Sequence, residues 1–235
     1  MGVWQDRYFI KVTPFLFIGR ANQRGGDLHK VPNRSLSWAL LAGFAVLIGI
    51  VAGLVVLRPS TVQIQSGTLL QQPRPIADFS LNGSDGKPYT KADLAGHWSV
   101  LYVGYTHCPD VCPTTLAQLK AVEKGLGAHA ARIRFIFLSI DPERDTPEAL
   151  GQYTHYFSPD FIAVTAPNAQ LDALGANLGY VYEKVPGATP QSYLMDHSSA
   201  LILIDPKAGL AGYLTPPFKT EALVSDLKQL VEKSS

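Results

Sequence analysis

The sequence predicts an α/β domain preceded by a single apolar helix, and three observations support this fold class. Segments with strand character alternate with helical segments between residues 76 and 233. A continuous run of 22 uncharged residues, 36–57, stands ahead of this alternation. The 235 residues contain two cysteines, Cys108 and Cys112, and this low count excludes a disulfide scaffold and a four-cysteine zinc module.

Two apolar runs rich in β-branched and aromatic residues predict buried strands at 98–105 and 133–140. The first run leads through a Cys-Pro-Asp-Val-Cys-Pro segment into a predicted helix at 114–127. Thr146 and Pro147 open another helix, because Thr is a favourable N-cap and Pro is favoured at the first helical position. These elements form the centre of the predicted domain.

The remaining elements are shorter and follow on both sides of this centre. An Asn-Gly-Ser-Asp-Gly turn between two extended pieces predicts a hairpin at 79–90. The other predicted elements are a strand at 161–165, a helix at 170–178, a strand at 181–185, a strand pair at 200–204 and 209–214, and an amphipathic helix at 220–232. Such an order indicates an α/β or a three-layer α+β arrangement.

The uncharged run 36–57 predicts a transmembrane helix. Its residues would span about 33 Å as a helix, which suffices for a hydrocarbon core of about 30 Å. The alternative is a secretory signal peptide, but that has an apolar core of about 7–15 residues and a small-residue cleavage site, whereas Arg58 and Pro59 follow this run. We therefore expect an uncleaved anchor, a polar linker at 58–75 and a compact domain at 76–235.

The distribution of charge predicts the orientation of this anchor. Residues 1–58 carry seven Lys and Arg and two Asp, whereas residues 59–235 carry 13 basic and 17 acidic residues. The positive-inside rule places the basic segment 1–35 in the cytoplasm and the domain in the periplasm, with one pass through the inner membrane. The net charge of +1 excludes the strongly basic profile of a general nucleic-acid-binding protein.

The two cysteines are the main candidates for chemistry, because they lie where a strand leads into a helix whose N-terminus favours the thiolate. Three interpretations compete for Cys108 and Cys112: a structural disulfide, the redox pair of a thiol–disulfide oxidoreductase, and a soft-metal site. The metal site is favoured, because a disulfide would close a very small loop and redox pairs usually have two intervening residues. Copper(I) accepts two thiolates and one imidazole, whereas zinc would need four ligands.

Six histidines could supply the imidazole. They are His29, His97, His107, His129, His155 and His197. The first of these lies in the predicted cytoplasmic segment, and the others except His197 stand in turn, loop or polar helical contexts. His197 directly precedes the predicted strand 200–204, and a loop in that position can approach the cysteines. Spacing therefore favours His197 and leaves His107, which adjoins Cys108, as an alternative.

Three blocks of the sequence together resemble motifs of the SCO/SenC family. They are GYTHCPDVCPTTL at 104–116, SIDPERDTPEAL at 139–150 and YLMDHSSALILIDP at 193–206. This family consists of membrane-anchored copper chaperones of cytochrome c oxidase assembly. The resemblance covers about residues 76–233, and it implies a thioredoxin-like fold with an inserted hairpin.

The resemblance also implies a set of metal ligands. By the family pattern, copper would be bound by Cys108, Cys112 and His197, and Asp141 would support the site without binding the metal. The expected cargo is copper(I), with copper(II) as an alternative that would add a fourth ligand.

The function implied by the resemblance is delivery of copper to the CuA centre of cytochrome c oxidase subunit II. The expected further partners are an upstream periplasmic copper donor and a thiol reductase that keeps the cysteines reduced. One alternative is a thiol–disulfide reductase that acts on the CuA cysteines of that subunit, with Cys108 and Cys112 as its redox pair. Another is a copper or redox sensor. His197 discriminates the first two, because a copper carrier needs the histidine and a reductase can lose it.

Overall fold

The computed structural model describes residues 34–56, 62–189 and 192–234. The chain divides into two units, of which the second begins at Ser60 and contains the sheet. Most of the basic segment predicted at 1–35 lies outside the described residues.

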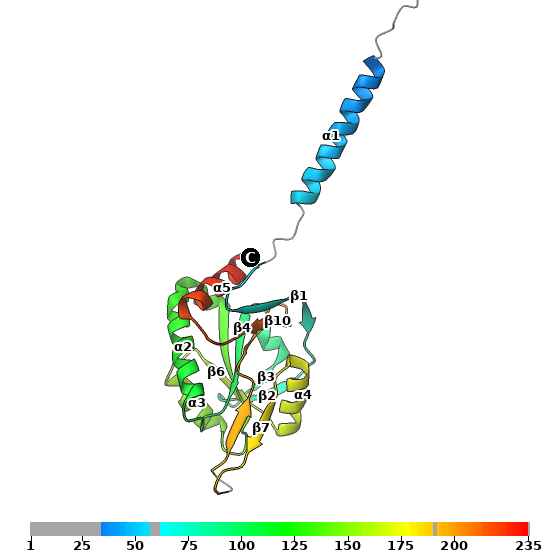
Figure 1. Cartoon of the computed structure of the whole chain (residues 1–235). Coiled ribbons are helices and arrows are strands. Elements are labelled where there is room, and N and C mark those ends of the chain that lie inside the picture. Colours follow the sequence, from blue (N-terminus) through cyan, green and yellow to red (C-terminus); the bar gives the residue numbers. More distant parts are fainter. Residues whose placement is uncertain (1–33, 57–61, 190–191, 235) are drawn as a thin grey trace, which may run out of the picture. The chain divides into compact units, whose positions relative to one another are not determined.

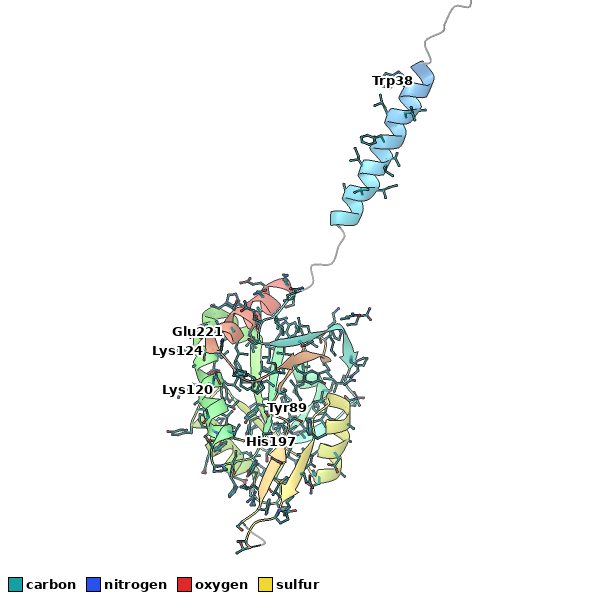
Figure 2. The ribbon with its side chains drawn as sticks, in the orientation of Figure 1. Trp38, Tyr89, Lys120, Lys124, His197 and Glu221 are labelled. Carbon is teal, nitrogen blue, oxygen red and sulfur yellow. The ribbon has the colours of Figure 1, made fainter. Side chains whose placement is uncertain are left out.

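The first unit contains helix α1 (Arg34–Val56), which forms where the uncharged run predicts a helix. Its apolar side chains from Trp38 to Ala52 are exposed, and Trp38 itself is 70% exposed (Figure 2). Within the part of the chain that the structure describes, no helix reaches the combination of length and hydropathy that defines a membrane span. The anchor at 36–57 stays a prediction.

The second unit is built on an eight-stranded sheet with the strand order β1-β10-β9-β4-β5-β6-β2-β3 (Figure 1). The strands of this sheet are β1 (Gly67–Pro75), β2 (Ser80–Gly83), β3 (Pro88–Thr90), β4 (Trp98–Gly104), β5 (Ile133–Ser139), β6 (Ile162–Thr165), β9 (Leu201–Ile204) and β10 (Gly209–Leu214). Strands β4, β5 and β6 are parallel, and β9 and β2 flank them in antiparallel orientation. A separate two-stranded sheet pairs β7 (Tyr182–Val185) with β8 (Leu194–His197).

Helices cover the large sheet on both sides. They are α2 (Val111–Leu126), α3 (Pro147–His155), α4 (Asn168–Leu178) and α5 (Thr220–Lys233), with short 3₁₀ helices at Lys91–Leu94 and Gly127–Arg132. Helix α2 packs against α5 on one side of the sheet, and α4 lies on the other (Figure 1). The predicted α/β class is thereby confirmed.

The core lies at the parallel pair β4 and β5. Every residue of β4 is buried, and the pair runs in register from Trp98 opposite Ile133 to Gly104 opposite Ser139. Strands covered on both faces have nearly continuous apolar runs instead of alternating apolar and polar residues. Such runs at 98–105 and 133–140 are the basis of the two strand predictions. The strand predictions at 98–105 and 133–140 are confirmed. So is the hairpin at 79–90, which forms β2 and β3 at one edge of the sheet.

The segment predicted as a linker at 58–75 differs from this expectation. Residues from Gly67 onward form β1, which pairs with β10 at the other edge of the sheet. Pro73 lies where the pairing register shifts between Leu69 and Arg74, and proline is tolerated at such irregularities and on edge strands. Just before β1, the buried Asp226 carboxylate of α5 accepts hydrogen bonds from the backbone N–H groups of Gln65 and Ser66 at 2.8–3.1 Å. Residues 65–75 are thus part of the folded domain.

Two further differences concern the candidate site. Helix α2 begins at Val111 rather than at residue 114, so its first turn includes Cys112. The second difference is strand β8, which was not predicted. It places His197 at the end of a strand. The four residues of β8 are too few to show an alternation of apolar and polar side chains. Its partner strand β7 lies on the far side of residues 186–193, so the pairing is not evident from the sequence. The hairpin β7–β8 is inserted between α4 and β9.

Candidate metal centre

The two cysteines lie at the junction between β4 and α2. Cys108 is in the loop that follows β4, and Cys112 is the second residue of α2 and is completely buried. Gly104, the last residue of β4, makes room for this arrangement. A Cβ atom there would lie 3.0 Å from Cys112 Sγ and 2.7 Å from a ring carbon of Phe137, which is closer than packed atoms allow. The absence of a side chain at Gly104 therefore lets the sulfur approach the strand.

The two thiols are free and have opposite electrostatic environments. Burial raises the pKa of Cys108, but hydrogen bonds from the backbone N–H groups of Cys112, Asp110 and Val111 outweigh it, so this pKa lies below its ordinary value. The Cys112 N–H donates to Cys108 Sγ at 3.4 Å. For Cys112, burial dominates and raises the pKa to about 12. Cys108 is therefore the more acidic and the more accessible thiol.

This difference predicts unequal reactivity in the reduced, metal-free protein. We expect iodoacetamide to modify Cys108 faster than Cys112 at neutral pH, by roughly tenfold or more, because the thiolate is the nucleophile. The rate at Cys108 should rise with pH through a midpoint below that of an ordinary thiol, whereas Cys112 should respond only as the pH approaches about 12. Peptide mapping by mass spectrometry across a pH series measures both rates. Equal rates in the folded protein would contradict this assignment.

His197 lies at the end of β8 and contacts Cys112. Its Nε2 lies 3.8 Å from Cys112 Sγ, although the two residues are 85 positions apart in sequence. Its Nδ1 lies 2.9 Å from the Ser198 carbonyl oxygen, which can only accept a hydrogen bond. Nδ1 of the neutral ring therefore carries the proton, and the Nε2 lone pair is left available for a metal. His197 is labelled in Figure 2.

Aromatic side chains complete the surroundings of this imidazole. The rings of Tyr102 and Tyr105 each lie 6.3 Å from the His197 ring, centroid to centroid, in edge-on orientations. Burial raises the pKa of the Tyr102 hydroxyl, and the neighbouring Cys112 raises it further. Tyr102 was not predicted as part of the site, because its position inside an apolar strand is that of an ordinary core residue.

The histidine that spacing left as an alternative has a different environment. His107 is exposed, and its Nδ1 lies 3.5 Å from a carboxylate oxygen of Asp145 and 3.1 Å from Thr106 Oγ1. His107, Asp141 and Asp145 form a group whose potential ligand atoms lie within 4.8 Å of one another. Both carboxylates already accept hydrogen bonds from protein groups, which indicates structural supports rather than metal ligands. Asp141 was expected to support the site, whereas Asp145 was missed.

Asp145 holds the loop that carries the cysteines. It is 1% exposed, and it accepts hydrogen bonds from Thr106 N at 3.0 Å, Thr106 Oγ1 at 2.5 Å and Ser139 Oγ at 2.6 Å. Thr106 lies two residues before Cys108, and Ser139 ends β5. The acidic block 139–150 indicated that carboxylates lie near the site. Sequence spacing could not show which groups each carboxylate contacts.

Together, the fold and the site define a class: an α/β protein with a cysteine pair at a strand–helix junction, in which the buried cysteine lies beside a histidine from a distant segment. A family model described as SCO1/SenC matches residues 68–232. The chain belongs to the SCO1/SenC family.

Two curated relatives illustrate the range of similar proteins. A "putative copper-binding protein" of Stutzerimonas stutzeri is 33% identical over 166 residues, which cover 70% of this chain and 80% of that protein. The mitochondrial "Protein SCO2 homolog" of Mus musculus is 33% identical over 154 residues, or 65% of this chain. The match spans 60% of the length of the mouse protein.

Solved structures share the fold. Bradyrhizobium japonicum ScoI with copper bound is 31% identical, with a TM-score of 0.62 over 66% of this chain and 99% of that chain. Apo Sco1 of Thermus thermophilus is 32% identical, with a TM-score of 0.65 over 73% of this chain and 99% of that chain. BsSco, a member of the Sco family of cytochrome c oxidase assembly proteins, matches in fold at 19% identity, with a TM-score of 0.55 over 69% of this chain and 98% of that chain. The thioredoxin-like architecture of these structures is the one predicted here.

Proposed function

We propose that this chain is a membrane-anchored copper metallochaperone that binds copper(I) through Cys108, Cys112 and His197. The observation that carries the proposal is the approach of His197 Nε2 to within 3.8 Å of Cys112 Sγ, beside a second cysteine in the same turn. Copper-binding relatives in the same family add support.

The donor set fits copper(I) chemically. Two thiolates and one imidazole are soft ligands, and three such ligands satisfy copper(I) but leave a structural zinc site incomplete. Because burial raises the pKa of Cys112 to about 12, this sulfur is protonated in the metal-free protein at neutral pH. Copper must therefore displace a proton from Cys112, so binding weakens as the pH falls.

The accessibility of the site suits delivery rather than storage. Cys108 and His197 are only partly buried, whereas Cys112 is fully enclosed. Ligands of a recipient can reach the metal from the side of Cys108 and His197 and replace these donors one at a time. We propose the CuA centre of cytochrome c oxidase subunit II as recipient, in keeping with the role of the family in oxidase assembly. A copper donor and a thiol reductase would act upstream.

The location is part of the proposal. An anchor at 36–57 with the basic segment 1–35 in the cytoplasm would hold the domain in the periplasm, at the inner membrane where an oxidase is assembled. The charge distribution supports this orientation.

The titration of the reduced chain with copper(I) tests the proposal. We expect one tightly bound copper(I) per wild-type chain under anaerobic conditions, and His197→Ala should weaken binding by roughly a hundredfold, because it removes a direct ligand. Competition with a chromophoric copper(I) chelator measures the affinity. His129→Ala is the matched control, since His129 contacts Glu232 rather than the cysteines. Wild-type affinity in His197→Ala would remove the third ligand from the proposal.

A thiol–disulfide reductase is the second candidate, and the unequal cysteines favour it. A half-buried thiol of lowered pKa next to a buried thiol of raised pKa is the arrangement expected of an attacking and a resolving cysteine. The two candidate functions differ in whether they require His197. Reduction of a disulfide substrate that survives His197→Ala, together with no stoichiometric copper(I) binding by the wild type, would favour the reductase.

A further inference from the structure

The strand that carries His197 belongs to a hairpin outside the large sheet. Among the strands that the structure describes, β7 and β8 pair with each other alone, with Tyr182 opposite His197 and Val185 opposite Leu194. Figure 1 shows this hairpin extending away from the sheet. An isolated two-stranded hairpin is marginally stable in water, so its position depends on side-chain contacts with the rest of the domain.

Tyr193, directly before β8, supplies the most enclosed of these contacts. The residue is 5% exposed, and its hydroxyl donates a hydrogen bond to Asp141 Oδ1 at 2.6 Å. Asp141 is 2% exposed and lies in the loop after β5. Its other oxygen accepts a hydrogen bond from Arg144 Nε at 2.5 Å, and Arg144 Nη1 donates to the Tyr193 carbonyl oxygen at 3.1 Å. Two of these hydrogen bonds bind the end of the hairpin's connecting loop to residues 141–144, and the third joins Arg144 to Asp141 within that segment.

Two cations stack on the ring of the same tyrosine. The Arg144 guanidinium carbon lies 3.5 Å from the ring centroid of Tyr193, and Lys184 Nζ lies 3.8 Å from it. Lys184 comes from β7 and also pairs with Glu143 at 2.7 Å. Both strands of the hairpin are therefore connected through Tyr193 to one loop, and cation–π contacts strengthen when they are partly removed from water.

The same loop contacts the other half of the metal centre. Asp145 holds Thr106, two residues before Cys108, whereas Asp141 and Arg144 hold Tyr193, four residues before His197. Contacts from one loop therefore hold both the segment before Cys108 and the segment before His197.

We propose that Tyr193 is a positioning residue that latches the β7–β8 hairpin onto the Asp141–Arg144 pair and so holds His197 beside Cys112. Opening of this latch withdraws the imidazole and leaves the bound metal on two sulfurs, from which a recipient can take it. The second half of this inference rests on the proposed function, whereas the latch itself is a property of the metal-free chain.

Tyr193→Phe tests the latch, because it removes the hydroxyl and keeps the ring that Arg144 and Lys184 contact. In the full-length, reduced, metal-free chain we expect backbone amides of β7 and β8 to exchange with deuterium about tenfold faster than in the wild type. Amides of β4 and β5 should keep their protection. Tyr156→Phe is the matched control, since Tyr156 is 81% exposed and far along the chain from the hairpin. Unchanged exchange of the hairpin, or an equal rise in all strands with a lowered melting temperature, would overturn the latch.

A second measurement addresses the metal. We expect copper(I) bound to Tyr193→Phe to pass to the chelator bicinchoninate several-fold faster than copper(I) bound to the wild type, at an unchanged melting temperature. Equal transfer rates despite a loosened hairpin would overturn the role of the latch in release. If the wild type binds no copper(I), the proposed function fails, and the exchange measurement still decides whether Tyr193 holds the hairpin.

Discussion

Cys112→Ser is expected to abolish tight copper(I) binding, with a loss of affinity of at least roughly two orders of magnitude. The replacement keeps a side chain of similar shape and removes one of two thiolates, and a hydroxyl is a poor ligand for a soft cation. Losing groups that merely orient metal ligands already costs about 10–100-fold, so losing a direct ligand should cost more. Because Cys112 is completely buried, no nearby water-accessible donor can replace it.

Anaerobic competition with a chromophoric chelator measures this loss, and the thermal melting temperature of the metal-free chain shows whether the variant folds. Cys108→Ser is the matched variant. It should also lose tight binding while leaving the buried Cys112 thiol, whose pKa of about 12 makes it a poor metal ligand alone at neutral pH. Stoichiometric, wild-type-like binding by a folded Cys112→Ser chain would refute the proposed ligand set.

Asp145→Ala is expected to destabilise the domain by about 3 kcal/mol and to disorganise the cysteine loop. The substitution leaves the Thr106 N–H and the Ser139 hydroxyl without their hydrogen-bond acceptor inside the protein. Each unsatisfied buried donor costs about 1–3 kcal/mol. Since the Asp145 carboxylate is 1% exposed, water cannot readily take its place. The loss of the contact to Thr106 should in addition weaken copper(I) binding, because that residue precedes Cys108.

Urea denaturation of the metal-free chain measures the free energy of unfolding, and Asp145→Asn is the matched control. An amide oxygen can still accept from Thr106 N and Ser139 Oγ, and the Thr106 hydroxyl can turn to accept from the amide NH₂. We therefore expect this control to lose only about 1 kcal/mol. An equal loss in both variants would show that charge, rather than these hydrogen bonds, makes Asp145 necessary.

Local patterns in the sequence determined much of the fold. The runs at 98–105 and 133–140 form buried strands because strands covered on both faces have nearly continuous apolar sequences, as these two runs do. The N-cap Thr146 began α3 as predicted, and its Oγ1 accepts a hydrogen bond from Ala149 N. The close spacing of Cys108 and Cys112 likewise needed no tertiary information, because both lie in one strand–helix connection.

The tertiary structure alone decided the contacts between distant segments. Periodicity describes how a segment divides its side chains between water and protein, but it does not say which other segment covers it. For this reason the sequence predicted a linker where β1 pairs with β10. The approach of His197 to Cys112 across 85 residues depends in the same way on the inserted hairpin, and the place of Asp145 beneath the cysteine loop depends on a partner 39 residues away. The sequence thus identified the two thiols of this protein, and the packing of its loops placed the imidazole beside that of Cys112.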